Sequence, residues 1–393
     1  MSKHPRGIIQ SNSQIKEPAL PAMIKSIHIE GYRGFSDFGM SGLQRVTLLV
    51  GNNNSGKTSV LESLFLLASQ GDPYSLWRVM WRRSERMPER ATANYPELDV
   101  SHLFHGHEIH LGSKFILSAE NQSPGRSVQF LIGEIPKEQS PQTPVAPGGI
   151  PTPSRVGLHI VAKPGTSAFV PLTRSGGLTS EALDSPRRLV RKRNNEEGVP
   201  AQFITAESFS GNELLALWDT VALTSSEERV LEALRLLEPD IERIAATAGN
   251  PPEFYGQPTN SRGGFRVKFK NIERPVPIGS MGDGTWRLLA MATVISQCKG
   301  GVLLIDEIDT GLHYSVMTRM WKLIFGAAKE LDVQVFATTH SFDCVKSLAQ
   351  LCHSDSEAAD SVSVQRIERH EPLAVPYTSK EIEVAALNQI EVR

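Results

Sequence analysis

The sequence predicts an α/β fold with a mixed, mainly parallel central sheet, an antiparallel β lobe and an inserted helical subdomain. Three features carry this prediction. In the last third of the chain, short and wholly apolar segments alternate with amphipathic ones, as strands and helices do around a parallel sheet. In the first half, several segments alternate apolar with polar residues, which is typical of antiparallel strands. Between these parts, apolar residues recur with helical spacing.

Length and composition narrow the class of protein. The 393 residues are enough for one large domain or two ordinary ones, and 40% apolar with 21% charged residues is typical of soluble globular proteins. The net charge of −2 gives no general attraction to nucleic acid, so binding to DNA would need a local basic patch. The three cysteines lack the spacing of metal ligands, and no run approaches the roughly 18 apolar residues of a membrane span. We therefore expect a cytoplasmic protein without membrane association.

The first part of the chain is predicted to be a tail followed by an N-terminal lobe. Residues 1–22 are polar and are expected to be a flexible tail, and the lobe spans residues 23–132. The lobe begins with a strand at KSIHIEGY and continues with the buried strand VTLLV (46–50). A helix follows from Lys57 to about Ala68, because its apolar residues share one face. Further strands, expected to be antiparallel, are KFILSAE, SVQFLIG and VGLHIVA.

The remainder divides into three parts. Residues 133–200 are predicted to be an insertion, rich in proline and glycine over 136–154 and basic at RRLVRKR (187–193). A helical subdomain over 201–262 includes SSEERVLEALRLLEPDIERIAATA, and a C-terminal lobe spans 263–393. The elements expected in that lobe are a strand GGFRVKFK, a helix DGTWRLLAMATVISQ, a strand GVLLID, a helix around 313–329, a strand VQVFATT and a helix from Ser341.

The segment GNNNSGKT matches the G-x-x-x-x-G-K-[ST] pattern of a phosphate loop, placed between a buried strand and a helix. Its glycines let backbone N–H groups surround phosphate oxygens, and the helix N-terminus adds a partial positive charge. Lys57 can reach the β- and γ-phosphates of a nucleotide, and the Thr58 hydroxyl can coordinate Mg²⁺. The predicted nucleotide-binding residues of this loop are Gly51, Asn52, Asn53, Asn54, Ser55, Gly56, Lys57, Thr58 and Ser59.

Two carboxylates follow the buried strand GVLLID. Asp306 is placed to hold Mg²⁺ together with Thr58, and Glu307 to polarise an attacking water as a general base. His340 follows the next strand and should lie at the same edge of the sheet, where it either senses the γ-phosphate or is a structural residue. Lys57, Glu307 and His340 are therefore the predicted catalytic residues.

Together these motifs resemble the ABC-type ATPase heads of the RecF/SMC/OLD group. In order along the chain they are the phosphate loop GNNNSGKTS, a signature-like GSMGDGTWR, the acidic strand VLLIDEID, a D-loop-like DTGLH and a switch histidine in TTHS. KSIHIEGYRGFSDF and the helical region from LWDTVAL are also similar to segments of that group. The resemblance spans roughly residues 23–350 without 133–200, and it implies a P-loop NTPase fold that binds ATP with Mg²⁺ and hydrolyses it.

In that family two heads enclose two ATP molecules, and the signature of one head covers the γ-phosphate held by the other. The resemblance therefore implies a homodimer or a higher homo-oligomer in which Ser280, Gly282 and Gly284 approach the partner's nucleotide. It places Asp309 in the seam between heads. Arg33, in GYRGF, either approaches the nucleotide or has a structural role.

Three functions fit these motifs. The first is an ATP-driven switch or sensor that controls a separate effector in bacterial anti-phage defence, where small proteins of this group frequently occur. The chain after Ser341 is too short for the Toprim nuclease domain of OLD-type proteins, so a nuclease would be another chain. The second is a RecF-like clamp on DNA for repair or recombination; RRLVRKR is its basic candidate, or is a solvated loop. The third, a transporter ATPase subunit, is disfavoured by the GYRGF opening and the irregular signature.

Overall fold

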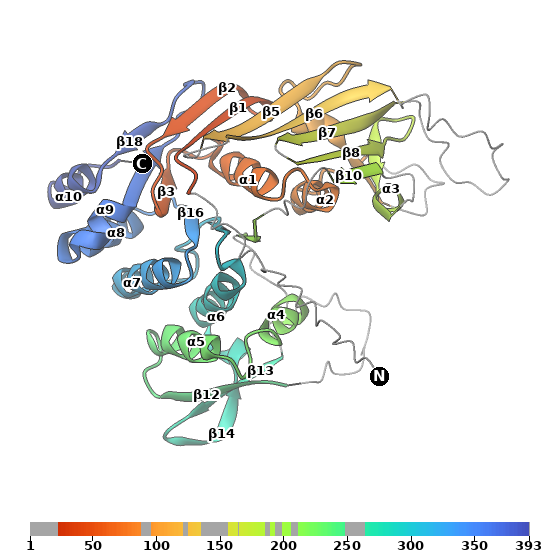
Figure 1. Cartoon of the computed structure of the whole chain (residues 1–393). Helices are drawn as coiled ribbons and strands as arrows, with labels where there is room; N and C mark the ends of the chain where they lie inside the picture. Colours follow the sequence, from red (N-terminus) through yellow and green to blue (C-terminus); the bar gives the residue numbers. More distant parts are fainter. Residues whose placement is uncertain are drawn as a thin grey trace, which may run out of the picture.

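The computed structural model describes residues 23–87, 96–120, 125–134, 156–163, 165–184, 189–192, 199–205, 211–247 and 264–392. Across these residues the chain forms two large sheets with helices between and beside them, and a smaller helical and β part below (Figure 1). The predicted tail, residues 1–22, and the Pro/Gly-rich stretch 136–154 lie outside the described residues.

The central sheet has six described strands in the order β11-β15-β16-β3-β17-β18. Every neighbouring pair is parallel except β17 with β18, which is antiparallel. Strands β3, β15 and β16 are buried at every residue, as expected for wholly apolar strands covered on both faces. The predicted mixed, mainly parallel sheet is therefore confirmed. Its strands are β3 Val46–Val50, β11 Ala201–Ile204, β15 Val302–Ile305, β16 Gln334–Thr338, β17 Val362–Arg366 and β18 Val375–Tyr377.

The second sheet is antiparallel and has the order β10-β8-β7-β6-β5-β1-β2. Three of its strands, β7, β8 and β10, come from the segment 133–200 that we predicted to be an insertion. The structure makes them three of the seven described strands of this sheet; β7, the antiparallel strand predicted at VGLHIVA, continues the ladder from β6 and buries alternate side chains. The strands are β1 Ser26–Tyr32, β2 Phe35–Ser41, β5 Lys114–Glu120, β6 Arg126–Glu134, β7 Val156–Lys163, β8 Thr166–Pro171 and β10 Leu189–Lys192.

Helix α1, Lys57–Ala68, lies between the two sheets, where the prediction placed a helix (Figure 1). Almost all of its side chains are buried, and its apolar residues belong to one hydrophobic cluster with residues of both sheets. Helix α2, Pro73–Arg82, follows after a short turn and starts with Asp72 as its N-cap. The position of α1 matters because its first turn carries the end of the phosphate loop.

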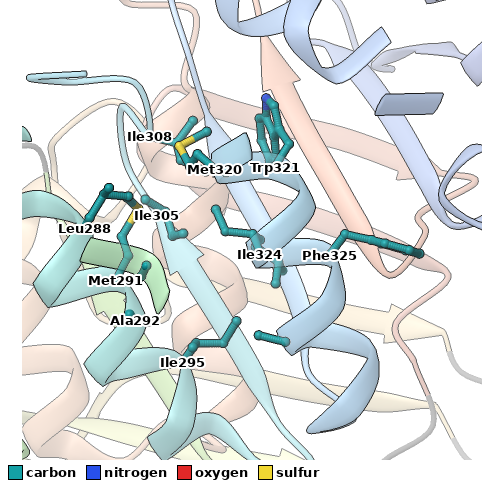
Figure 2. Packing of buried hydrophobic residues seen from close by; sticks show 14 of the residues in the cluster. Leu288, Met291, Ala292, Ile295, Ile305, Ile308, Met320, Trp321, Ile324 and Phe325 are labelled. Carbon is teal, nitrogen blue, oxygen red and sulfur yellow. The ribbon is translucent and has the colours of Figure 1, made fainter. Parts of the chain in front are cut away.

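The other face of the central sheet packs against the C-terminal helices. Figure 2 shows side chains of α6, among them Leu288 and Met291, on one side of Ile305 in β15, and side chains of α7, among them Met320 and Ile324, on the other. This packing fixes the two turns that follow β15 and precede α6. The helices are α6 Asp283–Ile295, α7 Tyr314–Glu330, α8 Phe342–Ser354, α9 Ser356–Ser361 and α10 Ser379–Leu387.

In its described residues the predicted helical subdomain, 201–262, contains helices α4 (Gly211–Trp218) and α5 (Ser225–Arg235), and its strand β12 joins β13 and β14 of the predicted C-terminal lobe in a small sheet of order β12-β13-β14. The sequence predicted a helix across residues 241–246, but these residues form strand β12. Pro239 is incompatible with a continuing helix, and Ile241 and Ile244 are buried when β12 pairs with β13. The strands are β12 Ile241–Ala246, β13 Phe265–Phe269 and β14 Ile272–Pro277.

The remaining elements are short. Strands β4 and β9 form a two-stranded sheet beside the antiparallel one. Among the described helices, none is both long and apolar enough to cross a membrane. The short elements are β4 Glu97–Asp99, η1 Val100–Leu103, β9 Gly177–Thr179, α3 Ser180–Asp184, η3 Ile278–Met281 and η4 Ser296–Cys298.

Candidate nucleotide-binding and hydrolysis site

The phosphate loop connects the C-terminal end of β3 to the N-terminus of α1, and its shape depends on two glycines. Gly51 has φ +138°, and a Cβ atom there would lie 2.2 Å from the carbonyl oxygen of Ile367. Gly56 has φ +102°, and its Cβ would lie 2.4 Å from the ring of Phe35. Neither position accepts a side chain without movement of the surrounding structure. The loop therefore packs closely against Ile367, which follows β17, and against Phe35 in β2, and its backbone leads into the N-terminus of α1.

Lys57 closes this loop from within. Its Nζ donates hydrogen bonds of 2.8 Å to the carbonyl oxygens of Gly51 and of Asn52, and the residue is only 5% exposed. Burial lowers the pKa of the ammonium to about 8, although Asp306 and Glu307 act to raise it. An ammonium held at this position can exchange the two carbonyl oxygens for phosphate oxygens without moving the backbone.

The phosphate loop contains a buried hydroxyl group, that of Ser55, that is available for a hydrogen bond to a ligand. This hydroxyl is buried, and within the described part of the chain it has no hydrogen-bond partner. Buried hydroxyl groups are normally satisfied, so one that is not satisfied in a phosphate-loop motif fits a ligand oxygen. This observation is independent of the motif match itself.

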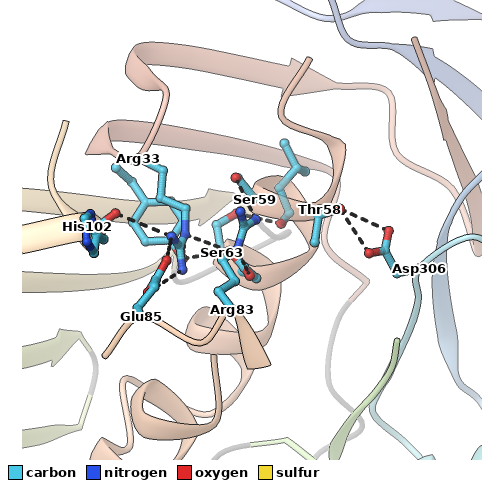
Figure 3. Close-up of polar contacts among 11 residues, drawn as sticks. Arg33, Thr58, Ser59, Ser63, Arg83, Glu85, His102 and Asp306 are labelled. Carbon is cyan, nitrogen blue, oxygen red and sulfur yellow. Dashed lines mark hydrogen bonds and ion pairs between the residues drawn. The ribbon is translucent and has the colours of Figure 1, made fainter. Parts of the chain in front are cut away.

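The Thr58 hydroxyl and the Asp306 carboxylate meet at the end of β15. The Thr58 Oγ1 atom donates to Oδ1 and Oδ2 of Asp306 at 3.2 and 3.0 Å (Figure 3). Thr338, in β16, donates to the same carboxylate at 2.6 Å and so fixes its orientation. No cluster of three or more His, Cys, Asp or Glu side chains suited to a metal occurs in the described residues. One hydroxyl and one carboxylate nevertheless fit Mg²⁺, which keeps several waters and takes further ligands from phosphates.

Glu307 lies immediately after Asp306 and has an unusual backbone conformation. Its φ is +48°, in the left-handed region that costs a residue with a side chain about 1–3 kcal/mol. The Glu307 N–H donates to the Thr338 hydroxyl at 2.8 Å, and the Thr310 hydroxyl donates to the carboxylate at 3.2 Å. The chain therefore leaves the strand direction at this residue, and neighbouring threonines hold both its backbone and its side chain.

Arg287, in α6, belongs to the site although it was not among the predicted site residues. Only 1% of its surface is exposed, and its guanidinium donates to backbone carbonyls of Thr205, Asp306 and Glu307, the last two at 2.6 and 3.0 Å. Burial lowers its pKa to about 10, so the group stays charged at neutral pH. The available signal was an arginine within the apolar run GTWRLLAMA, where a buried charge requires partners.

His340 and Asp309 lie beyond the ends of β16 and β15, which are parallel neighbours. His340 is partly exposed, and burial and then the Lys57 charge lower its pKa, so its imidazole is neutral at neutral pH. Asp309 accepts a 2.5 Å hydrogen bond from the Thr339 hydroxyl. The structure thus brings the predicted catalytic and metal-binding residues to one edge of the central sheet.

The signature-like turn lies at the N-terminus of α6. Ser280 and Gly282 are exposed, and Gly282, with φ +89°, is the N-cap of the helix. A Cβ atom on Gly284 would lie 2.7 Å from the carbonyl oxygen of Gly311. The turn is therefore in close contact with the D-loop-like segment DTGLH and presents its other side outward.

Arg33 occupies a buried ion-pair network and not the phosphate loop (Figure 3). It is 5% exposed; its Nε lies 2.8 Å from Glu62 Oε2, and its Nη1 pairs with Glu85. The Tyr32 hydroxyl accepts a further hydrogen bond of 3.1 Å from Nε. Of the two alternatives for Arg33, the contacts of this structure support the structural role, because carboxylates of α1 and of the segment after α2 already engage its guanidinium.

Comparison with known proteins gives two family matches. Residues 23–140 match a family described as "AAA ATPase domain", and residues 181–343 match one described as "AAA domain, putative AbiEii toxin, Type IV TA system". The chain is 21% identical over 375 residues to an ATP/GTP phosphatase of Helicobacter pylori. The aligned region covers 91% of this chain and 95% of that protein. It is 32% identical over 80 residues to an uncharacterised protein of Methanocaldococcus jannaschii, covering 20% of this chain and 68% of that protein.

Solved structures similar to the chain include the SMC head domain from Thermotoga maritima, with 13% identity, a TM-score of 0.40 and coverage of 90% of this chain and 98% of that one. The two family matches include the phosphate loop at one end of the chain, and the signature-like turn, Asp306, Glu307 and His340 at the other. The chain is therefore an ATPase, and it belongs to the P-loop ATPases that these two AAA-domain families describe.

Proposed function

We propose that this ATPase works as an ATP-dependent dimerising switch that controls a separate effector protein. The observation that carries the proposal is the meeting of Lys57, Thr58, Asp306, Glu307 and His340 where three neighbouring parallel strands end. Loops at the carboxyl ends of strands are where open α/β sheets bind ligands. The arrangement contains a phosphate-binding cation, a pair of metal ligands, a base and a hydrogen-bonding imidazole.

Each residue has a distinct role in the proposed reaction. The backbone of Gly51–Ser59 surrounds the phosphates, and Lys57 exchanges its carbonyl partners for oxygens of the β- and γ-phosphates. Thr58 and Asp306 hold Mg²⁺, which offsets the charge that develops on the phosphates. Glu307 accepts a proton from the attacking water, and neutral His340 donates a hydrogen bond to the γ-phosphate.

The signature-like turn supports the dimer. Ser280 and Gly282 are exposed at a helix N-terminus, and exposed N–H groups there favour an anion. The turn has no lysine of its own and packs against the segment that contains Asp309. We infer that Ser280, Gly282 and Gly284 cover a γ-phosphate bound by a second copy, so that the site is complete only between two chains.

The effector and its context rest on the family description. One matched family is described as an AbiEii-type toxin of a type IV toxin–antitoxin system, and that wording favours a defence role with a partner protein. A cytoplasmic location and a nuclease effector stay predictions. The alternative of a RecF-like DNA clamp depended on RRLVRKR, whose side chains lie outside the described residues, so it also stays a prediction.

The proposed function is tested by comparing the mass of the protein in solution with and without ATP. Wild-type protein should form dimers only transiently while it hydrolyses ATP, and Glu307→Gln should accumulate as a dimer because it binds ATP without turnover. Lys57→Ala should stay monomeric and should not bind ATP. A Glu307→Gln chain that binds ATP and remains a monomer would remove the dimer from the proposal while leaving the ATPase intact.

A further inference from the structure

Helix α2 carries a stripe of aromatic and basic residues on its exposed face. Tyr74, Trp77, Arg78 and Trp81 are spaced by three or four residues, so they follow one another along one side of the helix. Tyr74 is 43% and Trp81 41% exposed, Arg78 is also exposed, and Trp77 is partly buried. We call these four residues the α2 stripe. The opposite face of the helix supplies the core, through Leu76, Val79 and Met80.

The rings of the stripe are arranged as a platform. The Trp77 and Trp81 rings lie nearly parallel, with centroids 6.0 Å apart and 18° between their planes. The guanidinium of Arg86 lies over the Trp81 ring, 4.6 Å from its centroid. Trp77 packs partly against the hydrophobic core, whereas Tyr74 and Trp81 keep more than 40% of their surface exposed on the same side of the helix.

The helix itself has only basic charged residues, although the acidic residues Asp72 and Glu85 flank it. From Pro73 to Ser84 the sequence contains Arg78, Arg82 and Arg83 but no acidic residue. Arg82 and Arg83 face the protein, where they donate to the Phe203 carbonyl and to Glu62. Arg78 is exposed, although its guanidinium also lies 5.4 Å from the centroid of the buried Phe65 ring and feels the charges of Asp72 and Glu213. Arg86 lies against the Trp81 ring, so Arg78 and Arg86 provide the positive charge of the stripe, a combination that suits a ligand with phosphates and flat bases.

We propose that the α2 stripe binds single-stranded nucleic acid. The rings stack on unpaired bases, while the guanidinium groups of Arg78 and Arg86 contact the phosphates on either side. A duplex fits less well, because its bases are stacked on each other and their faces cannot reach the rings. A lipid surface also fits less well, because no large aliphatic side chain of α2 is exposed.

The stripe is connected to the phosphate-loop helix. Arg83, which caps the C-terminus of α2, donates to Glu62 at 2.7 Å and to the Ser59 hydroxyl at 3.2 Å, and both acceptors belong to α1 (Figure 3). Glu62 also pairs with Arg33, which in turn pairs with Glu85 at the end of the same turn. Nucleic acid bound on α2 would therefore be connected to α1 through Arg83 and the buried carboxylate of Glu62.

Tryptophan fluorescence of the full-length protein tests this proposal. The chain has five tryptophans, of which Trp218, Trp286 and Trp321 are buried, so quenching by a ligand on the surface reports on the stripe. Titration with oligodeoxythymidylate or oligouridylate should quench the tryptophan emission. The affinity measured in this way should fall as salt is added. The two arms distinguish DNA from RNA. Arg78→Glu and Trp81→Ala should each weaken binding by about fivefold or more.

The control variants distinguish binding at the stripe from binding elsewhere on the protein. Arg319→Glu changes an exposed arginine on α7 and should bind oligonucleotide as the wild type does. Lys57→Ala should also bind it, because the stripe does not require ATP. Absence of salt-sensitive quenching with both oligonucleotides, or unchanged binding by folded Arg78→Glu, would overturn the proposal. Quenching by anionic vesicles only would instead assign the stripe to a membrane. If no oligonucleotide binds and the mass of Trp81→Ala in solution differs from that of the wild type, the stripe would be assigned to contact with a second copy.

Discussion

At the scale of single residues, Lys57 must be charged to bind phosphate, but it is buried, and burial disfavours its charged form. Binding phosphate requires a charged ammonium, yet burial in the loop lowers the pKa of this group to about 8. The two carbonyl oxygens that accept its hydrogen bonds keep it oriented. The protein should therefore bind nucleotide best at a pH at which Lys57 is still protonated.

This gives a pH dependence with a defined sign. Because the pKa is lowered to about 8, Lys57 loses its proton as the pH rises through that value, and ATP affinity should fall above it. Well above the pKa, each further pH unit should weaken binding by up to about tenfold. Lys57→Arg, which stays charged, should bind ATP with little pH dependence over the same range. Equilibrium ATP binding measured across the range checks this, and a wild-type affinity that is flat to high pH would contradict it.

Arg287 is the second residue for which the structure makes a direct prediction. Arg287→Met should slow hydrolysis and lower the melting temperature, because the carbonyls of Thr205, Asp306 and Glu307 lose their common donor. Each buried acceptor left unpaired costs about 1–3 kcal/mol. The kinetic effect should fall on kcat more than on KM, because Arg287 supports the turn with Glu307 and not the phosphate loop.

A matched pair of variants tests the role of Arg287. Arg287→Lys can restore only part of the hydrogen bonding and should recover part of the activity. Arg319→Met, on the exposed side of α7, should change neither kcat nor the melting temperature. An Arg287→Met protein with wild-type kcat would show that the three carbonyls do not position Glu307.

At the scale of elements, the N-terminus of α6 joins three parts of the site. Gly284 lies against the carbonyl oxygen of Gly311, Arg287 holds the carbonyls after β15, and Ser280 and Gly282 face outward. Helix α6 therefore connects two parts of the proposed mechanism. One is the outward-facing turn that is proposed to cover the nucleotide of the partner subunit, and the other is the turn in the same chain that contains Glu307. A shift of this helix would act on both.

Gly282→Val tests this element. A Cβ atom on Gly282 would meet no atom within 4 Å outside its chain neighbours, but the φ of +89° is unfavourable for a β-branched residue. The variant should bind ATP normally, because Lys57 and Thr58 are untouched, and should lose ATP-dependent dimerisation and most hydrolysis. Calorimetric ATP binding and light scattering measure the two properties separately. A Gly282→Val protein that still dimerises would reduce the turn to a helix cap.

At the scale of the whole molecule, the proposal requires each active site to be shared by two chains. The sharing can be tested by mixing Lys57→Ala, which should not hydrolyse ATP alone, with Gly282→Val, which should retain little hydrolysis alone. Mixed dimers would have one phosphate loop and one signature turn intact on facing sides. An equal mixture should therefore recover up to about half of wild-type activity, because neither variant dimerises with itself and each mixed dimer has one complete site out of two. No recovery in a mixture that forms dimers would contradict shared sites.

Much of the fold and of the site could be predicted from sequence because the signals are local. GNNNSGKT and LLIDEID are contiguous, and the wholly apolar strands beside them predict the parallel sheet. The parallel order then brings Asp306 and His340 to the edge at which the phosphate loop lies, since strands β15, β16 and β3 are adjacent.

Other features depend on contacts between distant residues. Residues 241–246 have helical spacing of apolar residues, but pairing with β13 makes them a strand. Within the segment 133–200 the pattern indicates the antiparallel strand VGLHIVA, which is β7, but it does not show that β8 and β10 extend the same sheet. In both cases the competing structure is stabilised by hydrogen bonds to another strand, which local periodicity does not contain.

The sequence by itself determined the class of protein, the phosphate loop and the acidic turn, because each is written in residues that are neighbours along the chain. Only the tertiary structure decided the roles of Arg33 and Arg287. Arg33 could have faced a nucleotide, but it pairs with Glu62 and Glu85, and Arg287 looked like part of an apolar helix until β11 and β15 placed three carbonyls around it. A buried guanidinium takes its function from its partners, and those partners are assembled only when distant segments pack together.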